Sequence, residues 1–283
     1  MIRLHCTDSY CTFMTPMLSE DKALTELQNH VTIRHPVDQL TVYSLNYSSL
    51  RDGETLLHRS AAVGMKQRCE DLIKRGAQVD ATDYGYDTPL IYAAEEGHTD
   101  VCQMLLDCGA ELRYKNRLGD TALSEAARKG SYDTCQLLLT RGALVDAANN
   151  KRLTPLIKAA IHGHTDVCEL FLDHGADVLH KHDGGDSPLD CAALNGHLQT
   201  CKLLVSRGAD GDKALMKCLS DNNFKIASCL IEEGADLDWI KNPRWRHAFC
   251  DVVAYFRRKR YEDDLREKKR LEVMRRSKEN ENI

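Results

Sequence analysis

The sequence predicts an all-α protein in which short helices stack side by side as a solenoid. This prediction depends on three columns of residues that recur every 33 residues, and on the two short helices that each copy encodes. The columns are Thr55, Thr88, Thr121, Thr154 and Ser187; Gly64, Gly97, Gly130, Gly163 and Gly196; and Gly76, Gly109, Gly142, Gly175 and Gly208. A fixed period in three columns over five copies indicates a repeat architecture.

Each copy is predicted to form two helices and a turn. In the second copy, Thr88 is suited to cap the first helix and Pro89 to occupy its first turn. Gly97 ends this helix, a second helix follows, and Gly109 terminates that one. The polar stretch 111–120 carries a glycine and is expected to form a turn or an extended finger. Because isolated helices shorter than ~12–15 residues are marginal in water, each copy must bury its apolar faces against its neighbours.

The segments that open the first helices resemble the T-P-L-H signature of the ankyrin repeat. They are Thr55-Leu56-Leu57-His58, Thr88-Pro89-Leu90, Thr154-Pro155-Leu156 and Ser187-Pro188-Leu189. The pairs Gly97-His98, Gly163-His164 and Gly196-His197 are similar to the end of the first helix in that motif. The resemblance covers roughly residues 51–238. It implies an ankyrin-repeat helical solenoid with short β-hairpin or finger turns, in which these histidines cap helices or bridge between them.

Two copies depart from the pattern. Residues 211–238 form a sixth copy in which Lys213 stands where the threonine is expected, only five residues after Gly208. This copy is therefore predicted to keep both helices and to lack its finger. In the fourth copy Arg152 replaces the finger glycine, which leaves the geometry of that turn open. The array is predicted to span 51–240 as six repeats, of which the last is truncated.

Segments of different character flank the array. Residues 1–20 are predicted to be a loose N-terminus, and residues 21–50 an N-terminal cap or a degenerate repeat. Residues 241–283 are predicted to form a C-terminal capping helix and a charged helical tail. Their net charge is +6, against −11 for the rest of the chain. The basic tail is interpreted as a nuclear-import signal, a docking helix or a solvated helix face.

The composition favours a folded protein outside the membrane. Hydrophobic residues make up 42% of the 283 residues and charged residues 29%, which suits a packed core. No run of about 18 apolar residues occurs, so no transmembrane segment is expected. Residues 1–30 lack the continuous apolar stretch of a secretory signal. We therefore expect a cytoplasmic protein, with nuclear localisation as the alternative that the basic tail indicates.

The sequence favours no catalytic, cofactor or metal chemistry. Five of the twelve cysteines recur every 33 residues and are interpreted as small core residues: Cys69, Cys102, Cys135, Cys168 and Cys201. No C-x-x-C pair, P-loop, G-x-S-x-G, H-E-x-x-H or G-x-G-x-x-G motif occurs. We expect no enzymatic activity, no cofactor, no metal and no small-molecule substrate. Nucleic acid is disfavoured as a partner, because the array is acidic and has few aromatic residues for stacking.

The resemblance implies a protein-protein interaction module. Ankyrin arrays bind partners on a concave face made by the fingertips and the outer ends of the first helices. The matching positions of this sequence are Tyr84, Asp87, Glu95, Glu96, Lys115, Arg117, Leu118, Arg128, Lys129, Lys151, Leu153, Ile161, His162, Lys181, Leu194 and Asn195. The middle of this set is basic and is flanked by apolar or aromatic residues. We therefore expect the partner to be another protein that presents an acidic, partly apolar segment.

The expected role is that of a scaffold or adaptor without chemistry of its own. The alternative is a substrate-targeting or regulatory subunit of an enzyme complex, which would dock on its partner through the C-terminal helix.

Overall fold

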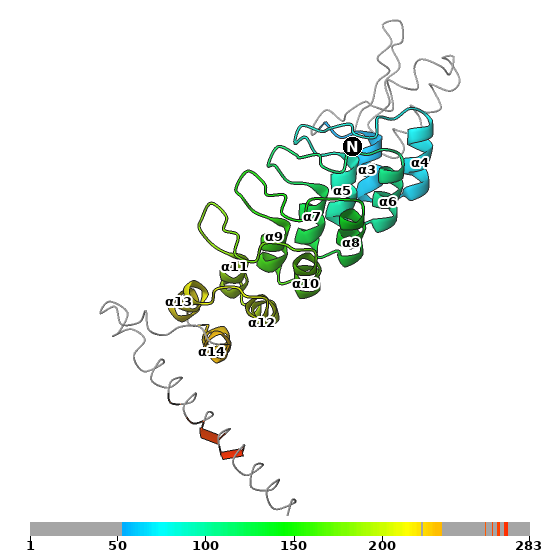
Figure 1. Cartoon of the computed structure of the whole chain (residues 1–283). Helices are drawn as coiled ribbons and strands as arrows, with labels where there is room; N and C mark the ends of the chain where they lie inside the picture. Colours follow the sequence, from blue (N-terminus) through cyan, green and yellow to red (C-terminus); the bar gives the residue numbers. More distant parts are fainter. Residues whose placement is uncertain are drawn as a thin grey trace, which may run out of the picture. The chain divides into compact units, whose positions relative to one another are not determined.

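The helices occur in pairs, and the first helices of the first five pairs begin 33 residues apart, as the sequence predicts (Figure 1). A computed structural model describes residues 53–221 and 223–233, together with positions 258, 262, 265, 266, 269 and 270. Within these residues the chain contains helices and no strands, which confirms the all-α class. The predictions for 1–20, 21–50 and the capping helix after 241 fall on residues outside this described part. The chain divides into two compact units, Met1–Ala122 and Leu123–Ile283, and each is described by itself.

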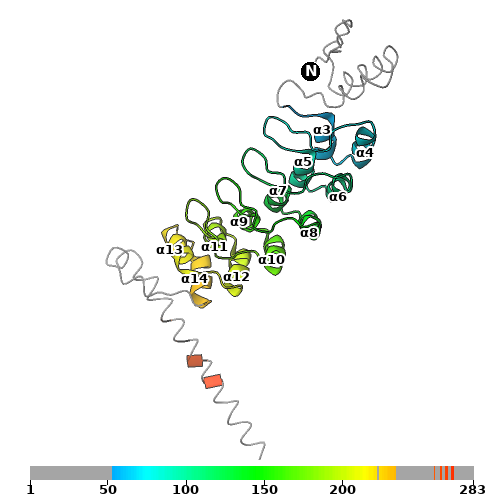
Figure 2. The same cartoon turned by 45° about the horizontal axis from the view of Figure 1, so that its top comes forward.

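The described part of unit 1 contains two helix pairs. The first pair is α3 (Leu56–Ala62) and α4 (Lys66–Lys74), and the second is α5 (Pro89–Glu96) and α6 (Thr99–Asp107). The first helices pack on each other, as do the second helices, because α3 contacts α5 and α4 contacts α6. Two layers of helices result, with the connecting fingers beside the first layer (Figure 2).

Unit 2 repeats this arrangement. Its helices are α7 (Ala122–Lys129), which begins at the last residue of unit 1, α8 (Tyr132–Thr140), α9 (Pro155–His162), α10 (Thr165–Asp173), α11 (Pro188–Leu194), α12 (Leu198–Ser206), α13 (Asp212–Ser220) and α14 (Phe224–Glu232). The helices α9, α11 and α13 pack in one row, and α8, α10, α12 and α14 pack in the other (Figure 2).

The helices begin and end where the repeated threonines and glycines predict. The hydroxyl of Thr88 accepts a hydrogen bond from the backbone N–H of Ile91 at 3.4 Å, and that of Thr154 accepts from Ile157 at 3.3 Å. Each hydroxyl thereby satisfies one of the N–H groups that a helix start leaves without a partner. Gly97 ends α5 with φ of 80°, in the left-handed region that suits glycine at a helix C-terminus.

The repeated cysteines lie in the core, as predicted. Cys69, Cys102, Cys135, Cys168 and Cys201 are all fully buried and free. Burial raises the pKa of the Cys69 thiol to about 11 and that of Cys102 to about 12. These thiols therefore stay protonated at neutral pH and act as small apolar side chains.

The histidines of the Gly-His pairs bridge between helix pairs, which confirms that expectation. In unit 1, Nε2 of His98 donates to the carbonyl of Ala62 at 3.0 Å. A Cβ atom on Gly64 would lie 2.8 Å from this ring, so the close approach requires glycine. The same bond recurs in unit 2 from His164 to Arg128 at 3.1 Å and from His197 to Ile161 at 2.9 Å.

The sixth helix pair follows the fifth without a finger between them. The helix α13 begins at Asp212, four residues after Gly208. The Nζ of Lys213 donates to the carbonyl of Gly185 and pairs with Asp186 at 2.8 Å. Lysine side chains of α13 therefore contact the fifth finger on the side where a sixth finger would otherwise pack.

Candidate partner-binding surface

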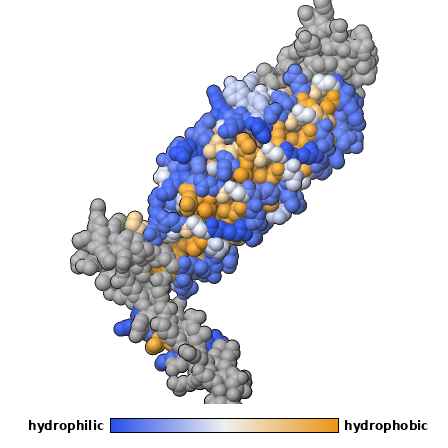
Figure 3. Space-filling view, viewed as in Figure 1, coloured by the Kyte–Doolittle hydropathy of each residue, from blue (hydrophilic) through white to orange (hydrophobic). Residues whose placement is uncertain are grey.

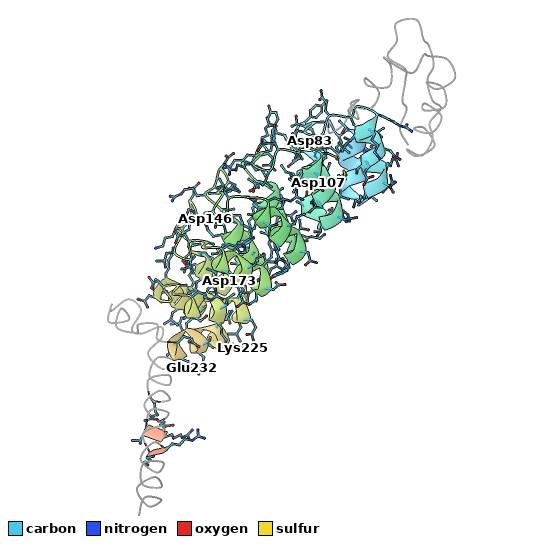
Figure 4. All side chains as sticks on the ribbon, turned by 45° about the vertical axis from the view of Figure 1, so that its right-hand side comes forward. Asp83, Asp107, Asp146, Asp173, Lys225 and Glu232 are labelled. Carbon is cyan, nitrogen blue, oxygen red and sulfur yellow. The ribbon has the colours of Figure 1, made fainter. Side chains whose placement is uncertain are left out.

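Each fingertip is a turn closed by one polar side chain. In finger two (residues 83–87), Oδ1 of Asp83 accepts from the N–H groups of Gly85 and Asp87, both at 2.8 Å (Figure 4 labels Asp83). In finger four (residues 149–153), Oδ1 of Asn149 accepts from Lys151 at 2.9 Å and from Leu153 at 3.0 Å. Because these bonds hold the backbone, the fingertips present their other side chains from a fixed framework.

One position in every finger adopts a left-handed backbone conformation. The φ angle is 81° at Gly53, 60° at Tyr86, 80° at Gly119, 57° at Arg152 and 77° at Gly185. The turn at Arg152, which the sequence left open, therefore has the same geometry as the glycine turns. For a residue other than glycine this conformation costs about 1–2 kcal/mol. Tyr86 was not predicted as such a position, although the 33-residue column places it there.

Fingers four and five (residues 180–186, with the tip at 182–186) lie side by side in unit 2. The N–H of Asp183 donates to the carbonyl of Lys151 at 3.1 Å. The Nε2 of His180 donates to the carbonyl of Arg152 at 2.9 Å. These bonds bring Lys151, Arg152 and Lys181 onto adjacent fingers, and all three are exposed. Within the described residues, none of the three side chains forms an ion pair.

The ends of two first helices add apolar groups in unit 2. Leu194, at the end of α11, is 44% exposed, while Leu153 and Ile161 are half-buried. Figure 3 shows apolar residues at the described surface with hydrophilic residues around them.

His162 is the last residue of α9 and is exposed. The part of its ring that is buried and the neighbouring His164 and Arg128 lower its pKa, which keeps the ring neutral at pH 7.

Arg128 belongs to a largely buried ionic network that was not predicted from the sequence. Its Nε donates to Oε2 of Glu125 at 2.7 Å, and Nζ of Lys158 donates to Oε1 at 2.8 Å. Burial alone would raise the pKa of Glu125, but Lys158 and Arg128 lower it overall, so the carboxylate is ionised. Glu125 and Lys158 occupy the same position of successive copies, and this pairing of opposite charges was the available signal.

In unit 1 the predicted residues divide between exposed groups and groups that hold the fingers. Tyr84 is 61% exposed and Leu118 62% exposed. The carboxylate of Asp87, in contrast, accepts from Asn116 at 2.7 Å, and its carbonyl accepts from His58 at 2.9 Å. Asp87 therefore connects finger two to its neighbours.

Unit 1 contains a second network that was not predicted from the sequence. The hydroxyl of Tyr92 lies 3.0 Å from carboxylate oxygens of both Glu54 and Asp83. Burial and these two acceptors raise the pKa of Tyr92 above its ordinary value. Tyr92 occupies in copy two the position that Glu125 and Lys158 occupy in copies three and four.

The sixteen predicted residues fall in both units. Unit 1 contains Tyr84, Asp87, Glu95, Glu96, Lys115, Arg117 and Leu118, and unit 2 contains Arg128, Lys129, Lys151, Leu153, Ile161, His162, Lys181, Leu194 and Asn195. The structure brings Lys151, Leu153 and Lys181 together on fingers four and five. It places Ile161, His162, Leu194 and Asn195 at the ends of α9 and α11.

Comparison with known proteins agrees with this architecture. The family model described as ankyrin repeats (3 copies) matches residues 27–116, 57–149 and 123–213. Among solved structures, the ankyrin repeat domain of human ASB11 is similar, with 26% identity and a TM-score of 0.61. The match covers 65% of this chain and 86% of that one. A search of the curated proteins returned no match.

The stacked helix pairs define a helical-repeat protein, and the chain belongs to the ankyrin-repeat family. Ankyrin repeats are generally protein-protein interaction modules, and their fold is typically non-catalytic. In the described residues, no group of three or more histidines, cysteines and carboxylates is placed to hold a metal ion. Of the helices described, none is long and apolar enough to cross a membrane.

Proposed function

We propose that this protein is a scaffold or adaptor that binds another protein through its fingers and the ends of its first helices. In unit 2 we call this surface the finger face and define it as Lys151, Arg152, Leu153, Ile161, His162, Lys181, Leu194 and Asn195. The partner contributes an acidic, partly apolar segment.

One observation carries the proposal. Lys151 and Lys181 are exposed on adjacent fingers, and neither side chain forms an ion pair within the described residues. Exposed apolar surface at Leu194, at the end of α11, belongs to the same face. Cations without partners attract an acidic segment and orient it, and apolar anchors supply the buried contact of an interface.

Unit 1 offers further exposed cationic, apolar and aromatic side chains. Lys115 and Arg117 are exposed on finger three (residues 116–120) and just before it, and Leu118 is exposed on its tip. Tyr84 presents an aromatic ring on finger two. Aromatic residues and arginine are enriched in protein interfaces, which supports a role for these side chains in partner binding.

The test begins with the protein that the full chain captures at low salt, identified by mass spectrometry. The double variant Lys151→Glu/Lys181→Glu is expected to lose this partner, and capture by the wild type is expected to weaken as salt increases. The matched control is Lys202→Glu/Lys225→Glu, which reverses two exposed charges on α12 and α14 (Figure 4 labels Lys225). Equal capture of the partner by both double variants and the wild type would show that the finger face does not bind this partner.

A second role is favoured by the C-terminal segment, as a subunit that docks on an enzyme. Arg258, Glu262, Leu265 and Lys269 are helical and exposed, so an accessible leucine lies among charged residues of both signs. Under this alternative, an enzyme subunit co-purifies with the full chain and is lost when the chain is truncated after residue 242. Retention of that subunit by the truncated chain would contradict docking through this helix.

A further inference from the structure

Two fingers carry a large side chain where the other fingers carry glycine. Tyr86 and Arg152 have φ angles of 60° and 57°, in the column where Gly53, Gly119 and Gly185 have 77–81°. Glycine adopts this conformation without the steric cost that other residues bear. Arginine at position 152 therefore destabilises finger four relative to glycine. Such outliers are concentrated at sites that bind ligands, where the side chain serves a purpose outside the fold.

The fold makes no use of the Arg152 side chain in the described structure. Its backbone N–H donates to the carbonyl of Asn149 at 2.9 Å, and its carbonyl accepts from His180 at 2.9 Å. Both bonds involve main-chain atoms that glycine also has. The guanidinium is exposed and forms no ion pair or hydrogen bond within the described residues.

The charged residues near Arg152 indicate which kind of chemical group it can bind. Lys151 precedes it and Lys181 lies on the adjacent finger, which also carries one exposed carboxylate, Asp183, whose N–H donates to the Lys151 carbonyl. A guanidinium binds a carboxylate through two parallel hydrogen bonds, and lysines on either side increase the local positive potential.

We propose that Arg152 is a specificity-determining residue that binds a carboxylate of the partner's acidic segment. This inference rests on the proposed function and identifies the side chain that recognises the acidic group. It also gives a reason for an arginine at a position where glycine would make the finger more stable.

The experiment measures stability and binding on the same full-length variants. The probe is a short fluorescein-labelled peptide of alternating glutamate and leucine residues, and binding is followed by fluorescence anisotropy. Arg152→Gly removes both the charge and the strain, whereas Arg152→Gln removes the charge alone. Lys202→Gln, on the exposed side of α12, is the matched control for the loss of one positive charge.

The expected results separate the effect of Arg152 on stability from its effect on peptide binding. Arg152→Gly raises Tm by about 2 °C, because the strain is removed and the greater freedom of glycine in the unfolded chain offsets only part of the gain. Arg152→Gln leaves Tm near that of the wild type. Both variants weaken peptide binding by about tenfold, the loss expected for one charge-assisted contact. Lys202→Gln changes neither quantity.

Three outcomes would overturn the inference. If the Arg152 variants bind the peptide as tightly as the wild type, the inference fails and the proposed function stands. If Arg152→Gly lowers Tm, the side chain supports the fold instead of the partner. If no form of the protein binds the peptide, the inference and the proposed acidic partner fail together.

Discussion

Finger two in unit 1 and finger four in unit 2 have similar backbone turns, but the residues in and around them carry opposite charges. Both turns are closed by a side-chain oxygen, from Asp83 or Asn149, and both hold a residue other than glycine at positive φ. Residues 78–97 nevertheless carry five carboxylates and no lysine, arginine or histidine. Residues 144–163 carry only one carboxylate and three basic residues, Lys151, Arg152 and Lys158. The hydrogen bonds that build a finger therefore leave its surface chemistry free to vary.

The same contrast extends to the first helices behind these fingers. At one position of the repeat, copy two carries Tyr92 and copy four carries Lys158. Tyr92 lies 3.0 Å from two carboxylates, whereas Lys158 pairs with Glu125 at 2.8 Å in a buried site. A buried ion pair contributes little net stability but is costly to break on one side. The two copies should therefore differ in their sensitivity to substitution at this position.

The largest effect is expected from Lys158→Ala. This change leaves the buried carboxylate of Glu125 with Arg128 as its charged neighbour, and removes the bond between copies three and four. We expect a loss of about 2–3 kcal/mol in the free energy of unfolding, measured by urea denaturation. The double variant Glu125→Met/Lys158→Met should recover most of this loss, because no unpaired charge stays buried. A loss below about 1 kcal/mol for Lys158→Ala would show that the pair is not coupled to the fold.

The pH dependence provides the control for this prediction. Burial alone would raise the pKa of Glu125, but its cationic neighbours lower it in the folded state. A lowered folded pKa means that the stabilisation is fully present above the unfolded value of about 4.3. It is lost as the pH falls through the folded pKa. The stability of the wild type relative to the double methionine variant should therefore decrease with acid, and a difference independent of pH would contradict the assignment.

A smaller effect is expected from Tyr86→Gly in finger two. Tyr86 is 53% exposed, so its removal loses little packing, and glycine relieves the cost of its left-handed backbone. We expect the protein to gain about 1 kcal/mol or less, seen as a small increase in Tm. Gly119→Ala, at the same position of finger three, is the matched control and should destabilise. A decrease in Tm for Tyr86→Gly would mean that the ring supports the fold.

The sequence predicted the features of the fold that depend on backbone conformation. Thr88 and Gly97 mark helix boundaries because a hydroxyl cap and a left-handed glycine are local requirements. The cysteine column was assigned to the core because its period placed every member on the same face of a short helix. The missing finger before Lys213 followed from the shortened spacing after Gly208.

The contacts of the surface side chains could be predicted less well from the sequence. That Arg128 binds a partner stays a prediction, and the structure adds a contact that the sequence did not indicate, from its Nε to Glu125. Asp87 was placed in the same set, although it joins finger two to Asn116 and His58. The Arg128–Glu125 pair depends on side-chain rotamers within α7, and the contacts of Asp87 depend on the neighbouring copies. A column of residue types does not determine either of these.

The central claim is that the fingers keep one backbone while their exposed side chains determine the partner. An exchange of fingertips tests it most directly: residues 150–152 of the full chain, Asn-Lys-Arg, are replaced by the Tyr-Gly-Tyr of residues 84–86. Because Tyr86 already adopts the required conformation, we expect Tm to change by no more than about 2 °C. Binding of the glutamate-leucine peptide should be lost. An unfolded variant, or one that still binds the peptide with wild-type affinity, would contradict the account.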